Sequence, residues 1–155
     1  MGYKIIIDSC GELLEEWKND EHFESVPLTL NVDGETIVDD ASFDQKAFLQ
    51  KVAASTECPK SACPSPERYM KAFDCEADRI YAVTLSAELS GSYNSAVLGR
   101  SLLKEDKPEK KIYVFNSRSA SVGETLIGMK IQECEEAGCT FEEVVSRVEA
   151  YIAEQ

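Results

Sequence analysis

Serine-rich polar segments follow three short apolar runs that have the character of buried strands. These segments are residues 8–10, 86–95 and 116–121. In a sheet of parallel strands they share the carboxyl edge, where ligands usually bind. The last two lead into stretches with helical spacing, and helix N-termini favour an anion because unpaired N–H donors and the helix dipole point at it. The residue types therefore predict a site for a carboxylate or a phosphate.

Each candidate residue in these segments also allows a purely structural interpretation. Ser90 could be only the N-cap of its helix, and Asp8 is expected to hydrogen-bond within a loop more readily than to catalyse. Arg118 fits either an anion ligand or a surface charge. His22 is the only histidine and lies in a charged segment, so we expect it to face solvent. Cys63 is expected to be a structural thiol rather than a nucleophile.

Motifs for enzymatic chemistry are missing from the chain. The sequence has no G-x-S-x-G elbow, no Walker phosphate loop and no G-x-G-x-x-G fingerprint, and a serine nucleophile would have one histidine to activate it. The six cysteines do not show the spacing of zinc sites, since Cys58 and Cys63, like Cys134 and Cys139, are five positions apart. We therefore expect a non-enzymatic protein with reduced thiols and no metal.

Composition excludes several other classes of function. The 155 residues are 43% hydrophobic and 29% charged, which is typical of one soluble domain. A formal net charge of −13 repels nucleic-acid phosphate. No apolar stretch approaches the roughly 18 residues of a membrane span, and no export signal precedes the first strand. These features predict a cytoplasmic protein that neither binds nucleic acid nor inserts into a membrane.

The apolar pattern places strands and helices alternately along most of the chain. Strands are expected at residues 3–8, 26–32, 35–38, 79–85 and 111–115, and helices at 12–17, 43–53, 66–73, 90–107, 124–137 and from 141 onward. Asp33-Gly34 predicts a two-residue hairpin. Ser42 with Gln45 predicts a capping box, and the three prolines of residues 55–66 predict an irregular loop. The alternation predicts a three-layer α/β/α fold with a mostly parallel, Rossmann-like sheet and a small β-hairpin.

Three segments together resemble the DegV family of bacterial fatty-acid-binding proteins. They are Ile7-Asp8-Ser9, the stretch Pro59-Lys60-Ser61-Ala62-Cys63-Pro64-Ser65-Pro66, and residues 85–96 with Leu-Ser-Gly-Ser-Tyr-Asn-Ser-Ala. The resemblance covers essentially the whole chain. It implies that residues 1–155 form the N-terminal α/β domain of the family, with the second, C-terminal domain outside this chain.

The resemblance also implies a ligand and a binding site. A long-chain fatty acid such as palmitate or oleate would bind between the two domains, and hydroxyl side chains would hold its carboxylate. Ser61 takes the place of a family threonine, while Ala62 and Cys63 replace a serine and a glutamine. The second contact falls on Ser90, with the Gly91 backbone beside it. A fatty acid kinase that converts the carboxylate to an acyl phosphate is the expected partner, and the fatty acid is the only ligand expected.

Two other classes of function remain open at this point. The chain could be an enzyme acting on a small phosphorylated or carboxylated molecule, with Asp8 or Cys63 as the reactive group. It could also be an interaction module that pairs through an exposed apolar face.

Overall fold

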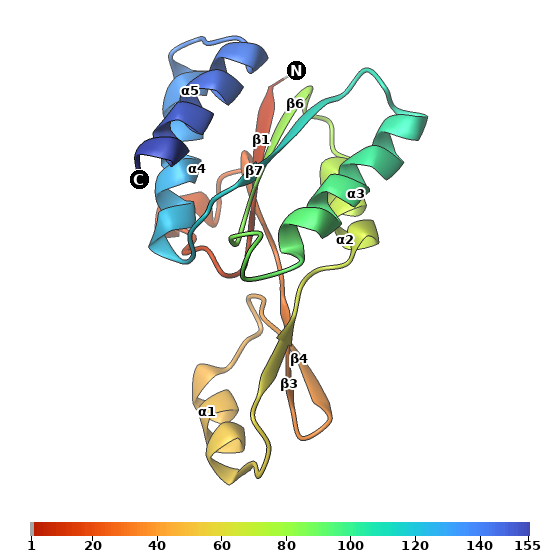
Figure 1. Cartoon of the computed structure of the whole chain (residues 1–155), viewed down its shortest axis with the longest axis vertical. Helices are drawn as coiled ribbons and strands as arrows, with labels where there is room; N and C mark the ends of the chain where they lie inside the picture. The colour runs from red at the N-terminus through yellow and green to blue at the C-terminus, as the bar shows by residue number, and fades with distance from the viewer. Residues whose placement is uncertain (1) are drawn as a thin grey trace.

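A four-stranded parallel sheet forms the centre of the molecule (Figure 1). The computed structural model describes residues 2–155. The strands lie in the order β2-β1-β6-β7, with bounds β1 (Tyr3–Asp8), β2 (Phe23–Val26), β6 (Arg79–Thr84) and β7 (Lys111–Asn116). Ile5 of β1 lies opposite Phe23 on one side and Tyr81 on the other. The predicted parallel sheet is therefore confirmed.

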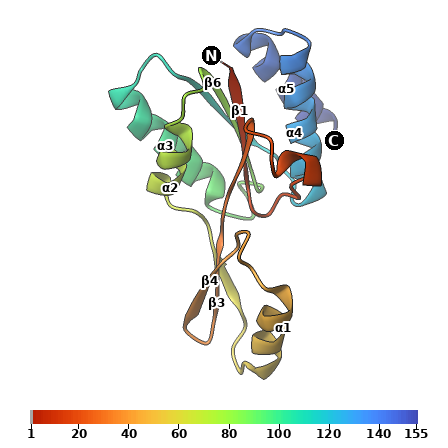
Figure 2. The same cartoon turned by 180° about the vertical axis from the view of Figure 1, so that it is seen from behind.

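Helices cover both faces of this sheet. α2 (Pro66–Phe73) and α3 (Ser92–Asp106) lie on one face, and α4 (Val122–Glu136) and α5 (Phe141–Glu154) lie on the other, as Figures 1 and 2 show from opposite sides. Because both faces are buried, β1 is apolar at successive positions: Ile5 and Ile7 pack toward α4 and α5, and Ile6 packs toward α2 and α3. The predicted three-layer fold is confirmed.

A small antiparallel sheet projects below the body and forms a separate lobe (Figure 1). Its strands are β3 (Thr29–Val32), β4 (Glu35–Val38) and β5 (Lys60–Ala62), in the order β4-β3-β5, and α1 (Gln45–Ala54) belongs to the same lobe. The predicted hairpin is confirmed, because Asp33 and Gly34 both adopt positive φ angles of 50° and 81°.

The third strand of this lobe contradicts the loop predicted for residues 55–66. Lys60 to Ala62 pair with β3, with Ser61 opposite Leu30. Pro59 and Pro64 lie outside the paired residues, so no proline removes a ladder hydrogen bond. The number of prolines in residues 55–66 therefore did not predict the structure of this segment correctly.

Two other predicted elements are shorter than expected. Residues 26–32 do not form one strand: the chain breaks at Pro27 and Leu28, and the two halves belong to different sheets. There the Leu28 N–H donates to the Ser9 hydroxyl instead of to a neighbouring strand. The helix predicted at residues 12–17 is only a 3-10 turn, η1 (Glu15–Trp17).

The predicted cap of α1 is also wrong. Asp44, not Ser42, is the N-cap, and its carboxylate accepts a hydrogen bond from Ala47 N at 3.1 Å. Ser42 instead donates to the Asp40 carboxylate. A serine three residues before a glutamine fits the capping pattern, but an aspartate one residue before the helix is the stronger cap here.

Other predicted helix boundaries are confirmed. Pro66 occupies the first turn of α2. Gly138 follows α4 with φ of 81°, and Thr140 forms a reciprocal capping box with Glu143 at the start of α5. None of the helices within residues 2–155 combines the length and the apolar composition needed to cross a bilayer.

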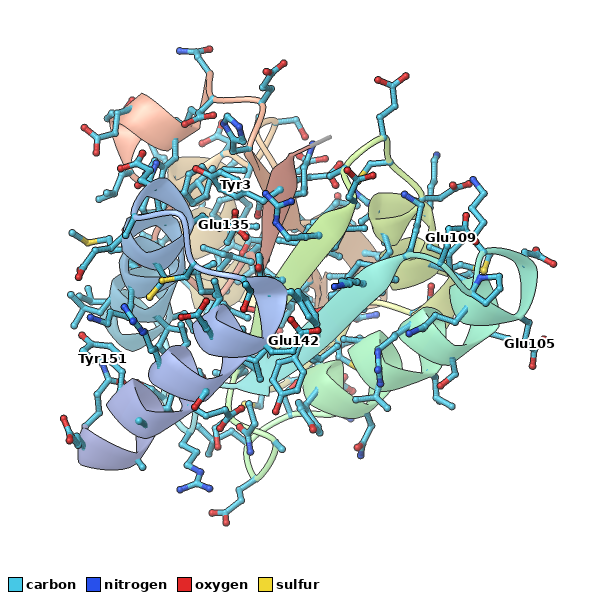
Figure 3. All side chains as sticks on the ribbon, turned by 90° about the horizontal axis from the view of Figure 1, so that it is seen from above. Tyr3, Glu105, Glu109, Glu135, Glu142 and Tyr151 are labelled. Carbon is cyan, nitrogen blue, oxygen red and sulfur yellow. The ribbon has the colours of Figure 1, made fainter. Side chains whose placement is uncertain are left out.

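The amino edge of the parallel sheet is closed by charged and aromatic side chains. Figure 3 views this end of the molecule, where Tyr3 and Glu135 are labelled. Arg79 donates hydrogen bonds from Nε and Nη2 to the two carboxylate oxygens of Glu135, and the Tyr81 hydroxyl also donates to Glu135. His22 lies at this edge too: its ring stacks on Tyr3 at 4.4 Å between centroids and hydrogen-bonds Asp20. It is only partly exposed and lies far from the carboxyl edge.

Candidate anion-binding site

The loops after β1, β6 and β7 meet at the carboxyl edge of the sheet, which faces the small lobe (Figure 1). Hydrogen bonds join them: Ser86 N donates to Ser119 O at 2.9 Å, and Ala87 N donates to the Asn116 side chain at 3.1 Å. Thr125 in α4 donates to Glu12 O at 2.6 Å. The three polar segments that the sequence predicted to share one edge do so.

Asp8 is the buried centre of this edge. Its side chain is fully inaccessible to solvent. One carboxylate oxygen accepts from Cys10 N at 3.2 Å, and the other accepts from Leu85 N at 2.7 Å and from the Ser92 hydroxyl at 3.0 Å. Asp8 thus fastens the loops together, as its structural interpretation predicted. The Asp8 carboxylate is not exposed to a substrate in this structure.

Glu124, in the first turn of α4, is a buried acid that sequence reasoning missed. It interacts with the side chains of Asp8 and Cys10, although its oxygens fall outside the strict distance and angle limits of a hydrogen bond. Burial and the neighbouring Asp8 carboxylate raise the pKa of Glu124 to about 11, so its carboxyl group is neutral at neutral pH. Acidic residues are common in the first turn of exposed helices, and no sequence signal distinguishes this buried one.

Ser90 lies half-buried just before α3. Its N–H donates to Ser86 O at 3.1 Å, and its hydroxyl oxygen accepts from Ser92 N at 3.1 Å. The N-cap of α3 is Gly91 and not Ser90. Within residues 2–155 the Ser90 hydroxyl proton has no acceptor among the hydrogen bonds found, so this O–H is free to donate to a ligand.

The segment that carries Ser61 lies beside the start of α3. Cys63 Sγ is 3.7 Å from Ser95 Oγ, and a Cβ atom placed on Gly91 would lie 3.3 Å from the same sulfur. Ser61 is exposed and comes two residues before Cys63 in an extended stretch, which separates them by about 7 Å along the chain. The segments of Ser61 and of Ser90 with Gly91 are therefore neighbours. Their joint contact with one carboxylate stays a prediction.

Apolar side chains border this edge. Leu89 and Val122 are 71% and 57% exposed, and Leu126 and Met129 continue the same stripe along α4. Arg118, in the loop after β7, is exposed and adopts a φ of 54°. Within residues 2–155 no group of three or more His, Cys, Asp or Glu side chains is arranged to hold a metal ion, and each of the six cysteines is free.

The fold is a doubly wound α/β domain, and its carboxyl edge, where ligands bind in such sheets, carries hydroxyl and N–H donors. The sequence model described as "Uncharacterised protein, DegV family" matches residues 3–155. The chain therefore belongs to the DegV family, as the resemblance predicted.

Relatives with curated sequences and with solved structures agree with this membership. A DegV domain-containing protein of Streptococcus pneumoniae is 41% identical over 97% of this chain and 54% of its own length. A DegV family crystal structure from Ruminococcus gnavus, refined with vaccenic acid, is 60% identical with a TM-score of 0.95, covering 98% of this chain and 55% of that one.

The Streptococcus pneumoniae Fatty Acid Kinase (Fak) B3 protein, loaded with linoleic acid, is 40% identical with a TM-score of 0.89, covering 99% and 55% of the two chains. The chain thus spans about half the length of the relatives it matches.

Proposed function

We propose that this chain is the carboxylate-holding part of a fatty-acid-binding protein, in which Ser61, Ser90 and the Gly91 backbone hold the head of a long-chain fatty acid. The observation that carries the proposal is the meeting of the Ser61 segment with Gly91 through Cys63. It is supported by a relative of 60% identity whose structure contains vaccenic acid.

The donors suit a carboxylate. A carboxylate removed from bulk water needs hydrogen bonds to its oxygens, and bonds to a charged group contribute about 1.5–3 kcal/mol each. The Ser90 O–H is free, the Ser61 side chain is exposed, and Gly91 is the N-cap of α3, whose N-terminus favours negative charge. The hydroxyls thereby fix the orientation of the head.

The acyl chain would supply most of the affinity. Burial contributes about 0.8 kcal/mol per CH₂, so some fourteen methylenes could gain on the order of 10 kcal/mol before the costs of binding. Leu89 and Val122 offer apolar surface at the rim. In this proposal residues 1–155 are the N-terminal domain, and the remaining part of the longer relatives is a second domain that completes the apolar tunnel.

The chemistry would belong to a partner. The Fak B3 relative carries the name of a fatty acid kinase system, and both acids at this edge, Asp8 and Glu124, are buried. The protein would present the carboxylate to a kinase, which forms the acyl phosphate, and would itself act as carrier.

Lipid analysis of the purified protein tests this function. The full native chain containing these residues is expressed, purified without detergent and examined by native mass spectrometry for bound palmitate or oleate. Wild type and the exposed α3 control Ser101→Ala should carry about one fatty acid per chain, and Ser61→Ala combined with Ser90→Ala should lose it. Equal loading of the double variant and wild type, or wild type free of fatty acid even when palmitate is added, would contradict the proposal.

A further inference from the structure

A chain of buried hydroxyl groups lies directly behind Ser90. The Tyr69 hydroxyl, on α2, is 2.6 Å from Ser92 Oγ, and Ser92 Oγ donates to the Asp8 carboxylate at 3.0 Å. Tyr69, Ser92 and Asp8 are all fully buried. The chain therefore runs from α2 through the first residue of α3 to the end of β1 without contact with solvent.

The direction of each hydrogen bond in this chain is fixed. Asp8 accepts from Leu85 N and from Ser92, so it takes the only hydroxyl proton of Ser92. Tyr69 must then donate to Ser92 Oγ, since Ser92 has no further proton to give. Burial raises the pKa of the Tyr69 phenol far above its usual range, so it remains a donor. Ser92 is thus held by one donor and one acceptor.

Ser92 is also hydrogen-bonded to Ser90. The Ser92 backbone N–H donates to Ser90 Oγ at 3.1 Å and occupies a lone pair of the Ser90 oxygen. The Ser90 proton has no acceptor among the hydrogen bonds of residues 2–155, and the neighbouring Gly91 and Leu89 are exposed. If Ser92 shifted, the N–H that orients the Ser90 hydroxyl would shift with it.

We propose that Ser92 and Tyr69 are positioning residues that aim the Ser90 hydroxyl at the ligand carboxylate, with Asp8 as the fixed acceptor at the end of the chain. The inference rests on the proposed function, because it concerns how that site distinguishes a carboxylate from an uncharged head. Neither residue touches the ligand.

A positioning role for Ser92 predicts a different effect from a purely structural role. The ionisable groups facing Asp8 are Glu124 from α4, Cys10 from the following loop and Tyr69 from α2. Loss of the Ser92 hydroxyl should loosen the aim of Ser90 without altering the surface that holds an acyl tail. The affected quantity is therefore the preference for a carboxylate, and not the affinity for a long alkyl chain.

The test compares two ligands with the same tail. Dissociation constants of palmitate and of hexadecanol are measured by displacement of a fluorescent fatty acid from the full native chain. Ser92→Ala should raise the palmitate constant about tenfold and Tyr69→Phe about threefold, as expected for weakening one hydrogen bond to a charged group. The hexadecanol constant should change by less than about twofold in both variants.

Matched controls separate site effects from loss of a hydroxyl in general. Ser101→Ala removes an exposed hydroxyl on the same helix, and Tyr113→Phe removes a phenol that donates to Glu149 on the far face of the sheet. These two control variants should leave the dissociation constants of palmitate and hexadecanol unchanged. Thermal unfolding is measured for every variant to check that it folds. If Ser92→Ala fails to fold, the Tyr69→Phe variant alone tests the proposal.

Two results would overturn the inference while leaving the proposed function intact. The first is a variant that weakens the binding of palmitate and of hexadecanol by the same factor, which would indicate a structural role. The second is an unchanged palmitate constant in the folded variants. Wild type that fails to bind palmitate would reject the proposed function itself, and this inference with it.

Discussion

Glu124 shows how one residue can set the pH dependence of stability. Its folded pKa of about 11 lies above its ordinary value of 4.5, because burial and the Asp8 carboxylate disfavour its charged form. A group with a raised folded pKa stabilises fully below its unfolded pKa, and that contribution is lost as pH rises toward the folded pKa. The window of loss therefore runs upward from about pH 4.5 and includes neutral pH.

Replacement of this acid by its amide should stabilise the protein at neutral and alkaline pH. The unfolded Glu124 ionises while the folded one does not, so each pH unit in the window costs up to about 1.4 kcal/mol. Glu124→Gln removes this cost, and its advantage over wild type should grow by about 1–4 kcal/mol between pH 5 and pH 8 in urea unfolding. The exposed Glu109→Gln should show no such growth. If the free energy of unfolding of Glu124→Gln shows no pH-dependent gain over wild type, the Glu124 carboxyl group is not protonated in the folded protein.

At the scale of elements, the sequence predicted those strands and helix ends that depend on residues close together in the chain. The central strands are continuous apolar runs, and Thr140 with Glu143 marks a helix start by side chains three residues apart. β5 was missed because its partner, β3, lies some thirty residues earlier in the chain, and pairing over that distance leaves no local periodicity. The same reason explains Glu124: its partner Asp8 comes from another element.

The contact between α2 and α3 depends on one glycine that periodicity alone does not single out. A Cβ atom on Gly99 would lie 2.6 Å from Pro66 O and 2.9 Å from Met70 N, and both are backbone atoms that cannot rotate away. The helices can approach this closely only with hydrogen at that position. The contact also places Tyr69 against Ser92.

Gly99→Ala should therefore destabilise the protein, although alanine favours a helix. Overpacking costs about 1–3 kcal/mol, which exceeds the gain of up to about 1 kcal/mol in helix propensity. Denaturant unfolding measures the difference, with the exposed Ser101→Ala on the same helix as the control. A Gly99→Ala variant as stable as wild type would show that α2 and α3 can separate without loss.

At the scale of the whole molecule, the two edges of the parallel sheet have different character. Figure 3 shows the end where Glu105, Glu109, Glu135 and Glu142 are labelled, and it lies away from the carboxyl edge. The net charge of −13 opposes an anionic ligand at long range, and salt screens this repulsion beyond about 8–10 Å. Affinity for a carboxylate must therefore come from short-range donors at the serine-lined edge and from burial of the tail.

Membership of the family was predictable from the sequence motifs, whereas the geometry of the proposed site was not. Ser61 and Ser90 were named from motif positions, and only the structure shows that Cys63 lies against Gly91 and that the Ser92 N–H donates to Ser90 Oγ. The Cys63 contact joins the residue just after β5 to the start of α3, so it depends on the placement of two sheets.

A crystal structure of the full native chain with bound palmitate tests the central claim most directly. The measured quantities are the distances from the carboxylate oxygens to Ser61 Oγ and Ser90 Oγ. Both should be hydrogen-bond distances of about 2.5–3.0 Å, with the acyl tail leading away past Leu89 or Val122. A carboxylate bound elsewhere, with neither hydroxyl in contact with it, would contradict the account.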